Sequence, residues 1–76
     1  MEKIVRRQLA SSFQHEEIDA ILLEAESDSP SAEFIVGRAL EAANEHDESV
    51  KWYRRCAEQG YAPALERLRR DSPNAA

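Results

Sequence analysis

The stretch Asp47–Leu68, D-E-S-V-K-W-Y-R-R-C-A-E-Q-G-Y-A-P-A-L-E-R-L, predicts a helix, a stop and the start of a second helix. Asp47 has the side chain of an N-cap, and Glu48 adds negative charge where the helix dipole favours it. Gly60 is suited to end the helix because glycine adopts positive φ without a steric penalty. The apolar side chains of this helix share one arc: Val50, Trp52, Tyr53, Cys56 and Ala57. Other helices must cover that arc.

Outside this stretch, the spacing of apolar residues predicts further helices over 2–11, 13–26, 30–44 and 63–70. Ser12 is the expected N-cap of the second of these, and Ser29 with Pro30 is expected to begin the third. The small residues on one face of helix 30–44 indicate that it packs closely on its neighbours. We therefore expect one all-α domain of about five helices over residues 1–70, followed by a flexible tail over 71–76.

The composition limits the classes of protein to which the chain can belong. Its 76 residues are enough for one small domain with a modest core, so self-association as a homodimer is an open possibility. The single cysteine excludes an internal disulfide and a thiolate zinc cluster. The charged N-terminus lacks the apolar run of a signal peptide, and no segment approaches the roughly 20 apolar residues of a membrane span. We expect a cytoplasmic protein with no membrane contact.

The net charge of −5 is spread unevenly. Residues 16–48 hold most of the 15 acidic residues and only Arg38 as a base, whereas residues 49–76 are mainly basic. Phosphate contacts need clustered Lys and Arg, so the acidic middle argues against direct nucleic-acid binding. It is compatible with binding to a basic protein surface.

The chain also carries an internal repeat at an offset of 32 residues. Most of the matched positions are apolar and belong to the faces described above: Ile18 with Val50, Ile21 with Tyr53, Ala25 with Ala57, Ala32 with Ala64, and Val36 with Leu68. This pattern is expected where two helical hairpins use the same packing scheme.

The run A-E-F-I-V-G at 32–37, then Asp47, then K-W-Y-R-R-C-A-E-Q-G-Y-A-P-A at 51–64 and Leu68, resembles a Sel1-like repeat, a relative of the tetratricopeptide repeat. The positions that match the family's structural residues are Ala32, Gly37, Asp47, Trp52, Tyr53, Ala57, Gly60, Ala64 and Leu68. The family's Gly-x-Gly-Val loop is absent, and Leu40 stands where Tyr is usual. The resemblance implies a short solenoid of helical hairpins that binds proteins, with one full unit over about 30–62.

Several aromatic and aliphatic residues have two possible roles. Trp52 and Tyr53 could form a recognition platform, but their place on the apolar arc favours the core. Phe34 lies opposite the main stripe of its helix, so it either packs on helix 13–26 or stands exposed for a partner, and packing is favoured. Leu23 lies among acids and faces away from its own stripe, which indicates an exposed or interface position.

The sequence contains no convincing catalytic, metal or cofactor site. His15 and His46 stand apart, and adjacent residues such as His46 and Asp47 point in different directions, whereas zinc needs three or four convergent ligands. Cys56 lies on an apolar face where burial would make its thiol inert. The sequence has no glycine-rich phosphate loop. We therefore expect neither enzymatic activity nor a cofactor.

The favoured function is a non-enzymatic protein-protein interaction module, an adaptor or regulator. The alternative is a small acidic inhibitor that blocks a basic or nucleic-acid-binding groove of a target enzyme. The residues predicted to contact the partner are Glu16, Glu17, Leu23, Glu24, Phe34, Arg38 and Glu41.

Overall fold

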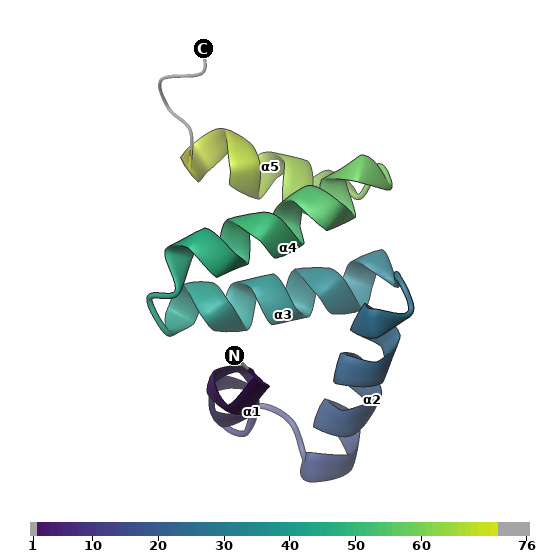
Figure 1. The fold of residues 1–76 in the computed structure, drawn as a ribbon, viewed down its shortest axis with the longest axis vertical. Coiled ribbons are helices and arrows are strands. Elements are labelled where there is room, and N and C mark those ends of the chain that lie inside the picture. The colour runs from purple at the N-terminus through teal and green to yellow at the C-terminus, as the bar shows by residue number, and fades with distance from the viewer. Residues whose placement is uncertain (1, 72–76) are drawn as a thin grey trace.

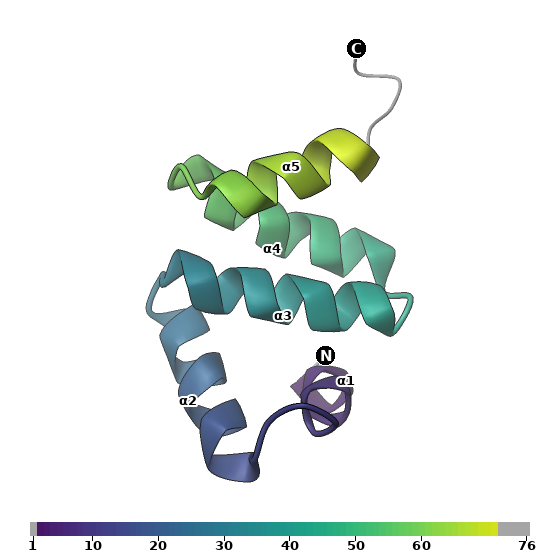
Figure 2. The same ribbon diagram turned by 180° about the vertical axis from the view of Figure 1, so that it is seen from behind.

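Helices account for nearly all of the computed structural model, which describes residues 2–71. The elements are α1 (Glu2–Leu9), α2 (His15–Glu26), α3 (Pro30–Ala42), α4 (His46–Glu58) and α5 (Ala62–Asp71), and residues 2–71 contain no strand. Helices α3 and α4 lie side by side, and α5 packs on the far side of α4 (Figures 1 and 2). Helices α1 and α2 contact α3 at the other end of the molecule, where α2 crosses α3 steeply. The predicted all-α fold of five helices is confirmed.

Three successive helices end in the same way. After α2, α3 and α4, the residue with positive φ is Asp28 (64°), Asn44 (64°) and Gly60 (82°), respectively. In each case the next residue donates its backbone N–H to the carbonyl five residues earlier, as Tyr61 does to Cys56 at 3.2 Å. This is the Schellman arrangement, which satisfies carbonyl groups left free at a helix end. The predicted role of Gly60 is confirmed.

The helix beginnings correct two of the sequence predictions. The N-cap of α4 is Glu45, and Asp47 lies within the first turn, where its charge still suits the helix dipole. The N-cap of α2 is Gln14 instead of Ser12, and its backbone N–H donates to Glu17 Oε1 at 2.8 Å. The N-cap of α4 therefore lies two residues before the predicted one, and that of α2 lies two residues after it. Ser29 and Pro30 begin α3 as predicted.

The C-terminal boundary also differs from the prediction. Asp71, the first residue of the predicted tail, belongs to α5. Residues 72–76, the remainder of that tail, lie outside the described residues.

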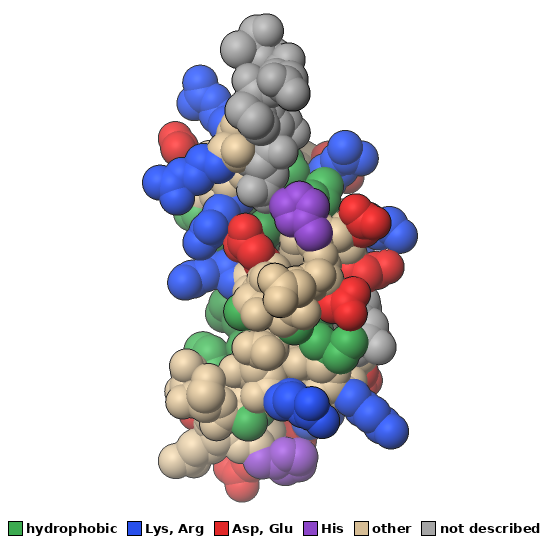
Figure 3. All heavy atoms as spheres, turned by 90° about the vertical axis from the view of Figure 1, so that its left-hand side faces the viewer, with side chains coloured by type: hydrophobic (Ala, Val, Ile, Leu, Met, Phe, Trp, Pro, Cys, Tyr) green, Lys and Arg blue, Asp and Glu red, His purple; other side chains and the backbone are tan. Residues whose placement is uncertain are grey.

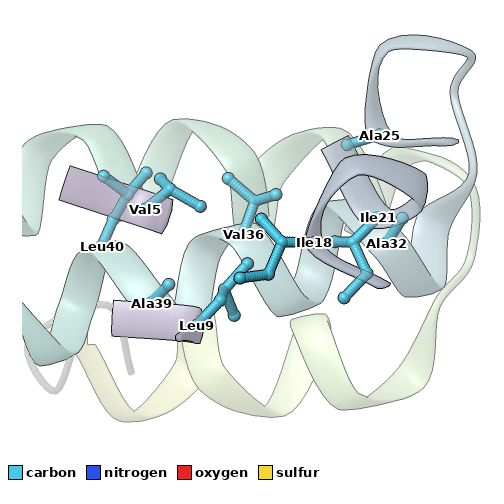
Figure 4. Close-up of a cluster of buried hydrophobic side chains, with 9 residues drawn as sticks. All are labelled: Val5, Leu9, Ile18, Ile21, Ala25, Ala32, Val36, Ala39 and Leu40. Atoms are coloured by element: carbon cyan, nitrogen blue, oxygen red, sulfur yellow. The ribbon is translucent and has the colours of Figure 1, made fainter. Parts of the chain in front are cut away.

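The main core fills the space between α1, α2 and α3 (Figure 4). Val5 and Leu9 of α1 meet side chains of α2 and α3 there, and Trp52 of α4 packs against the edge. The buried members of this core are Val5, Leu9, Ile18, Ile21, Ala25, Ala32, Val36, Ala39 and Leu40. At its side, Arg6 Nη2 lies 2.7 Å from Asp19 Oδ1 and lowers the pKa of that carboxyl. Helix α1 is thus held to α2 by charge as well as to α3 by apolar contact.

A second packing layer joins α3 to α4 around Tyr53, which is fully buried. A Cβ atom at Gly37 would lie 2.6 Å from Tyr53 Cε1, so the absence of a side chain there makes room for the ring. The Tyr53 hydroxyl donates to Glu41 Oε1 at 2.8 Å, and Arg67 of α5 lies 3.3 Å from the same oxygen. The predicted core role of Tyr53 and structural role of Gly37 are confirmed.

The helix bounds follow the 32-residue offset found in the sequence. Helices α2 and α4 end at Glu26 and Glu58, and α3 and α5 begin at Pro30 and Ala62. The residues with positive φ at Asp28 and Gly60 have the same separation. The repeat therefore describes the turns from α2 to α3 and from α4 to α5 as well as which residues are apolar.

Candidate protein-binding surface

The outward side of α2 is the most distinctive surface on the described residues. Leu23 lies on it with 67% of its surface exposed, the highest value among the large hydrophobic residues described. We use the term "α2 outer surface" for the exposed side chains on this side of the helix, Glu16, Glu17, Ala20, Leu23, Glu24 and Ser27. Every charged group of this set is a carboxylate. A large apolar side chain ringed by charges of one sign is typical of a contact with another macromolecule.

The sequence pattern explains why these residues point outward. Ile18, Ile21 and Ala25 form the buried stripe of α2 against α3. With 3.6 residues per turn, Leu23 and Ala20 lie on the side of the helix opposite this buried stripe. Glu17 also accepts a hydrogen bond from the backbone N–H of Gln14 and so helps to begin the helix. Glu16 and Glu24 form no ion pair or hydrogen bond with another described side chain.

The structure separates the predicted partner-binding residues into two groups. Glu16, Glu17, Leu23 and Glu24 are together on α2 and exposed, in agreement with the prediction for Leu23. Glu41 instead faces the interior between α3, α4 and α5, where Tyr53 and Arg67 engage it. Its carboxylate thus joins three helices, and Glu41 is not part of the exposed group on α2. Arg38 is exposed, but it lies beside the hollow between α1 and α3, near Phe13 and Ala39.

Phe34 packs within the protein, but with neighbours other than those expected. Its ring lies 5.4 Å from the ring of Tyr53 and 5.5 Å from that of Tyr61, in tilted arrangements. The aromatic contacts are therefore on the α4 and α5 side of α3, and not on helix 13–26 as predicted. Tilted ring pairs at this distance are favourable. Phe34 is thus a residue of the α3–α4–α5 junction and not an exposed anchor.

Glu33 is the residue that the sequence-based reasoning missed. It is fully buried in the first turn of α3. Its Oε1 accepts a hydrogen bond from Gln59 Nε2 at 2.8 Å, while Oε2 has no hydrogen-bond partner among the described residues. Arg55 Nη2 lies 3.4 Å from Oε2 and 3.0 Å from Asp28 Oδ1, so it supplies charge compensation without a hydrogen bond to Glu33.

A signal for Glu33 was present in the repeat. At the offset of 32 residues it aligns with Leu65, so the repeat has a large hydrophobic residue at the position where α3 has Glu33. The carboxylate and Arg55 lie on different helices and far apart in sequence, and only the folded chain brings them together.

Trp52 and Cys56 lie on the side of α4 that meets the core. Trp52 is half-buried and lines a hollow with Val5, Leu22 and Val36, and the Arg55 guanidinium carbon lies 4.8 Å from the Trp52 ring centroid. Cys56 is fully buried. Burial, assisted by the nearby Glu33 charge, raises the pKa of its thiol to about 11. The thiol is therefore protonated near neutral pH, as expected for an inert structural cysteine.

The remaining predicted structural residues differ in burial. Ala32 and Ala64 are buried, whereas Ala57 and Leu68 are half-buried. Leu68 belongs to α5, which has no helix on its outer side within residues 2–71, and this terminal position accounts for its partial exposure. Ala57 belongs to the last turn of α4.

Acidic and basic side chains occupy different parts of the molecular surface. On the face shown in Figure 3, acidic side chains gather beside the middle and basic side chains lie mainly toward the two ends. Helix α2 itself carries Glu and Asp and no Lys or Arg. The described residues contain no group of three or more His, Cys, Asp or Glu placed to hold a metal ion.

None of the helices in residues 2–71 has the length and apolar character needed to cross a membrane. Comparisons with models of known protein families, with curated proteins and with solved structures give no match. The candidate surface is therefore defined by its own geometry and charge.

Proposed function

We propose that this protein is a non-enzymatic interaction module, a Sel1-like helical stack that binds a basic surface on another protein through the α2 outer surface. The observation that carries the proposal is the exposure of Leu23. This residue is 67% exposed on α2, a helix that contains Asp and Glu and no Lys or Arg. A partner would cover Leu23 with an apolar side chain and place Lys or Arg beside Glu16 and Glu24. Contacts of this kind combine an apolar centre with a charged rim.

The internal contacts support a binding role for α2 in particular. The polar groups of the α3–α4 pair are engaged with one another, as the contacts of Glu33 and Glu41 show. Glu16 and Glu24 remain directed to solvent. Exposed carboxylates steer a basic partner toward the surface and raise the rate of association.

A quantitative pull-down from a lysate of the source organism tests this proposal. Leu23→Gln and Glu24→Gln should each reduce the amount of the specifically retained protein, and the matched variant Glu58→Gln, an exposed acid on α4, should not. Added salt should weaken retention because exposed charges are screened. Equal retention by all variants at low and at high salt would contradict the proposal.

A further inference from the structure

The largest unpaired helix faces lie at the two ends of the molecule. Helix α5 lies at one end of the long axis, and α1 and α2 lie at the other (Figure 1). Among the described residues, the two exposed large hydrophobic side chains are Leu23 on α2 and Leu65 on α5, the latter 46% exposed. We use the term "α5 outer surface" for the exposed stripe Ala62, Leu65 and Arg69.

The 32-residue offset relates these two surfaces to the α3–α4 contact. Helix α5 corresponds to α3, and α2 corresponds to α4, as their ends show. Within α3–α4, Glu33 meets Arg55 and Gln59, and Gly37 meets the Tyr53 ring. The residues at the corresponding positions are Leu65 for Glu33, Leu23 for Arg55, Ser27 for Gln59, Arg69 for Gly37 and Ile21 for Tyr53.

We infer that the α5 outer surface of one copy binds the α2 outer surface of a second copy, as α3 binds α4 within the chain. This inference rests on the same α2 surface as the proposed function and names a partner for it. The buried Glu33–Arg55 pair would be replaced between copies by Leu65 against Leu23, the two exposed large hydrophobic residues of the described chain. Arg69 would lie near the exposed Glu17 and Glu24 of the second copy.

Charge complementarity selects a second copy as the occupant. The Arg69 side chain is 81% exposed, and among the described residues its one ion pair is a 3.9 Å contact with Glu66. The positions beside Ile21 on α2 are Glu17 and Glu24, which align with Ser49 and Cys56 of α4. A guanidinium placed between these carboxylates is paired with opposite charge, whereas two α2 surfaces facing each other would repel.

The side of α2 that this contact requires is open. Arg6 of α1 approaches α2 at Asp19, and α3 covers Ile18, Ile21 and Ala25. Glu17, Ala20, Leu23 and Glu24 are exposed on the remaining side. Because the contact joins different surfaces, a pair of copies has one free α2 outer surface and one free α5 outer surface. Further copies can bind there, so assembly continues head to tail unless it closes into a ring.

Sedimentation analysis of two single variants tests the inference. The average mass of the wild type should rise with concentration and fall with added salt. Leu23→Gln and Leu65→Gln each remove the apolar contact from one surface and should weaken self-association by roughly tenfold or more. Lys51→Gln, an exposed change on α4 outside both surfaces, should behave as the wild type.

Mixing the variants distinguishes this contact from a symmetric one. The Leu65→Gln chain keeps its α2 surface and the Leu23→Gln chain keeps its α5 surface, so an equimolar mixture should form a complex of one copy of each. A variant that remains a dimer by itself would show a symmetric contact instead. Circular dichroism on each chain verifies that its helices are intact.

The outcomes separate this inference from the proposed function. A wild type that remains monomeric at every concentration overturns the second copy as partner, and retention of a foreign protein can still depend on Leu23. Self-association that needs both leucines, with retention of foreign proteins unaffected by Leu23→Gln, contradicts the proposed function and supports the inference.

Discussion

Gly37 leaves room for the Tyr53 ring between α3 and α4. The ring occupies the space that a side chain at Gly37 would need. The ring has little freedom to move because the Phe34 ring packs against it in a tilted arrangement and Glu41 accepts a hydrogen bond from its hydroxyl. Burial and this hydrogen bond also raise the pKa of the Tyr53 phenol, which keeps it protonated as a donor.

Substitution of Gly37 by alanine should therefore destabilise the protein by about 1–3 kcal/mol, because the added methyl group overpacks the contact with Tyr53. Urea unfolding of Gly37→Ala measures the loss. In a Tyr53→Ala background the same change should cost far less, since the ring is gone. An equal cost in both backgrounds would mean that the clash with Tyr53 is not the cause.

At the scale of the element, the ends of α2, α3 and α4 share one backbone conformation. Asp28, Asn44 and Gly60 follow one another at intervals of 16 residues, and all have positive φ. Only Gly60 adopts this conformation without cost from a side chain, and Asn and Asp tolerate it better than most other residues. The sequence signal was therefore clear at Gly60 and weak at the other two ends.

Asn44→Gly should stabilise the protein by about 0.5–1 kcal/mol, because it removes the side chain from a left-handed residue. Thermal unfolding followed by circular dichroism measures the change. Ala43→Gly, one residue earlier at φ −90°, is the matched control and should destabilise. Stabilisation by Ala43→Gly, or a loss with Asn44→Gly, would show that the backbone at Asn44 does not determine this end.

At the scale of the whole molecule, the stability is concentrated in the middle. Helices α3 and α4 make the most extensive contact, and α3 also contacts α1 and α2. Helix α5 packs on α4 and leaves Leu65 exposed. The two end helices, α1 and α5, thus have fewer neighbours than α3.

Hydrogen exchange should show that the central helices are more stable than the end helices. The backbone amides in the middle of α3 and α4 should exchange at least about tenfold more slowly than those of α1 and α5, because end helices open without unfolding the centre. Mass spectrometry or NMR on the wild type at low concentration measures the rates. Uniform protection across all five helices would show a single cooperative unit instead. At high concentration, the inferred assembly predicts added protection of α5 and α2.

The sequence by itself determined the helix content, the turn at Ser29 and Pro30, the stop at Gly60 and the burial of Tyr53. These features depend on local propensity and on apolar spacing along one helix, both of which are visible in a linear chain. The tertiary structure decided the direction of Phe34, the internal role of Glu41 and the burial of Glu33 beside Arg55 and Gln59. Each of these depends on which second helix lies opposite, and a carboxylate can be buried only where distant residues supply its donors and its counter-charge.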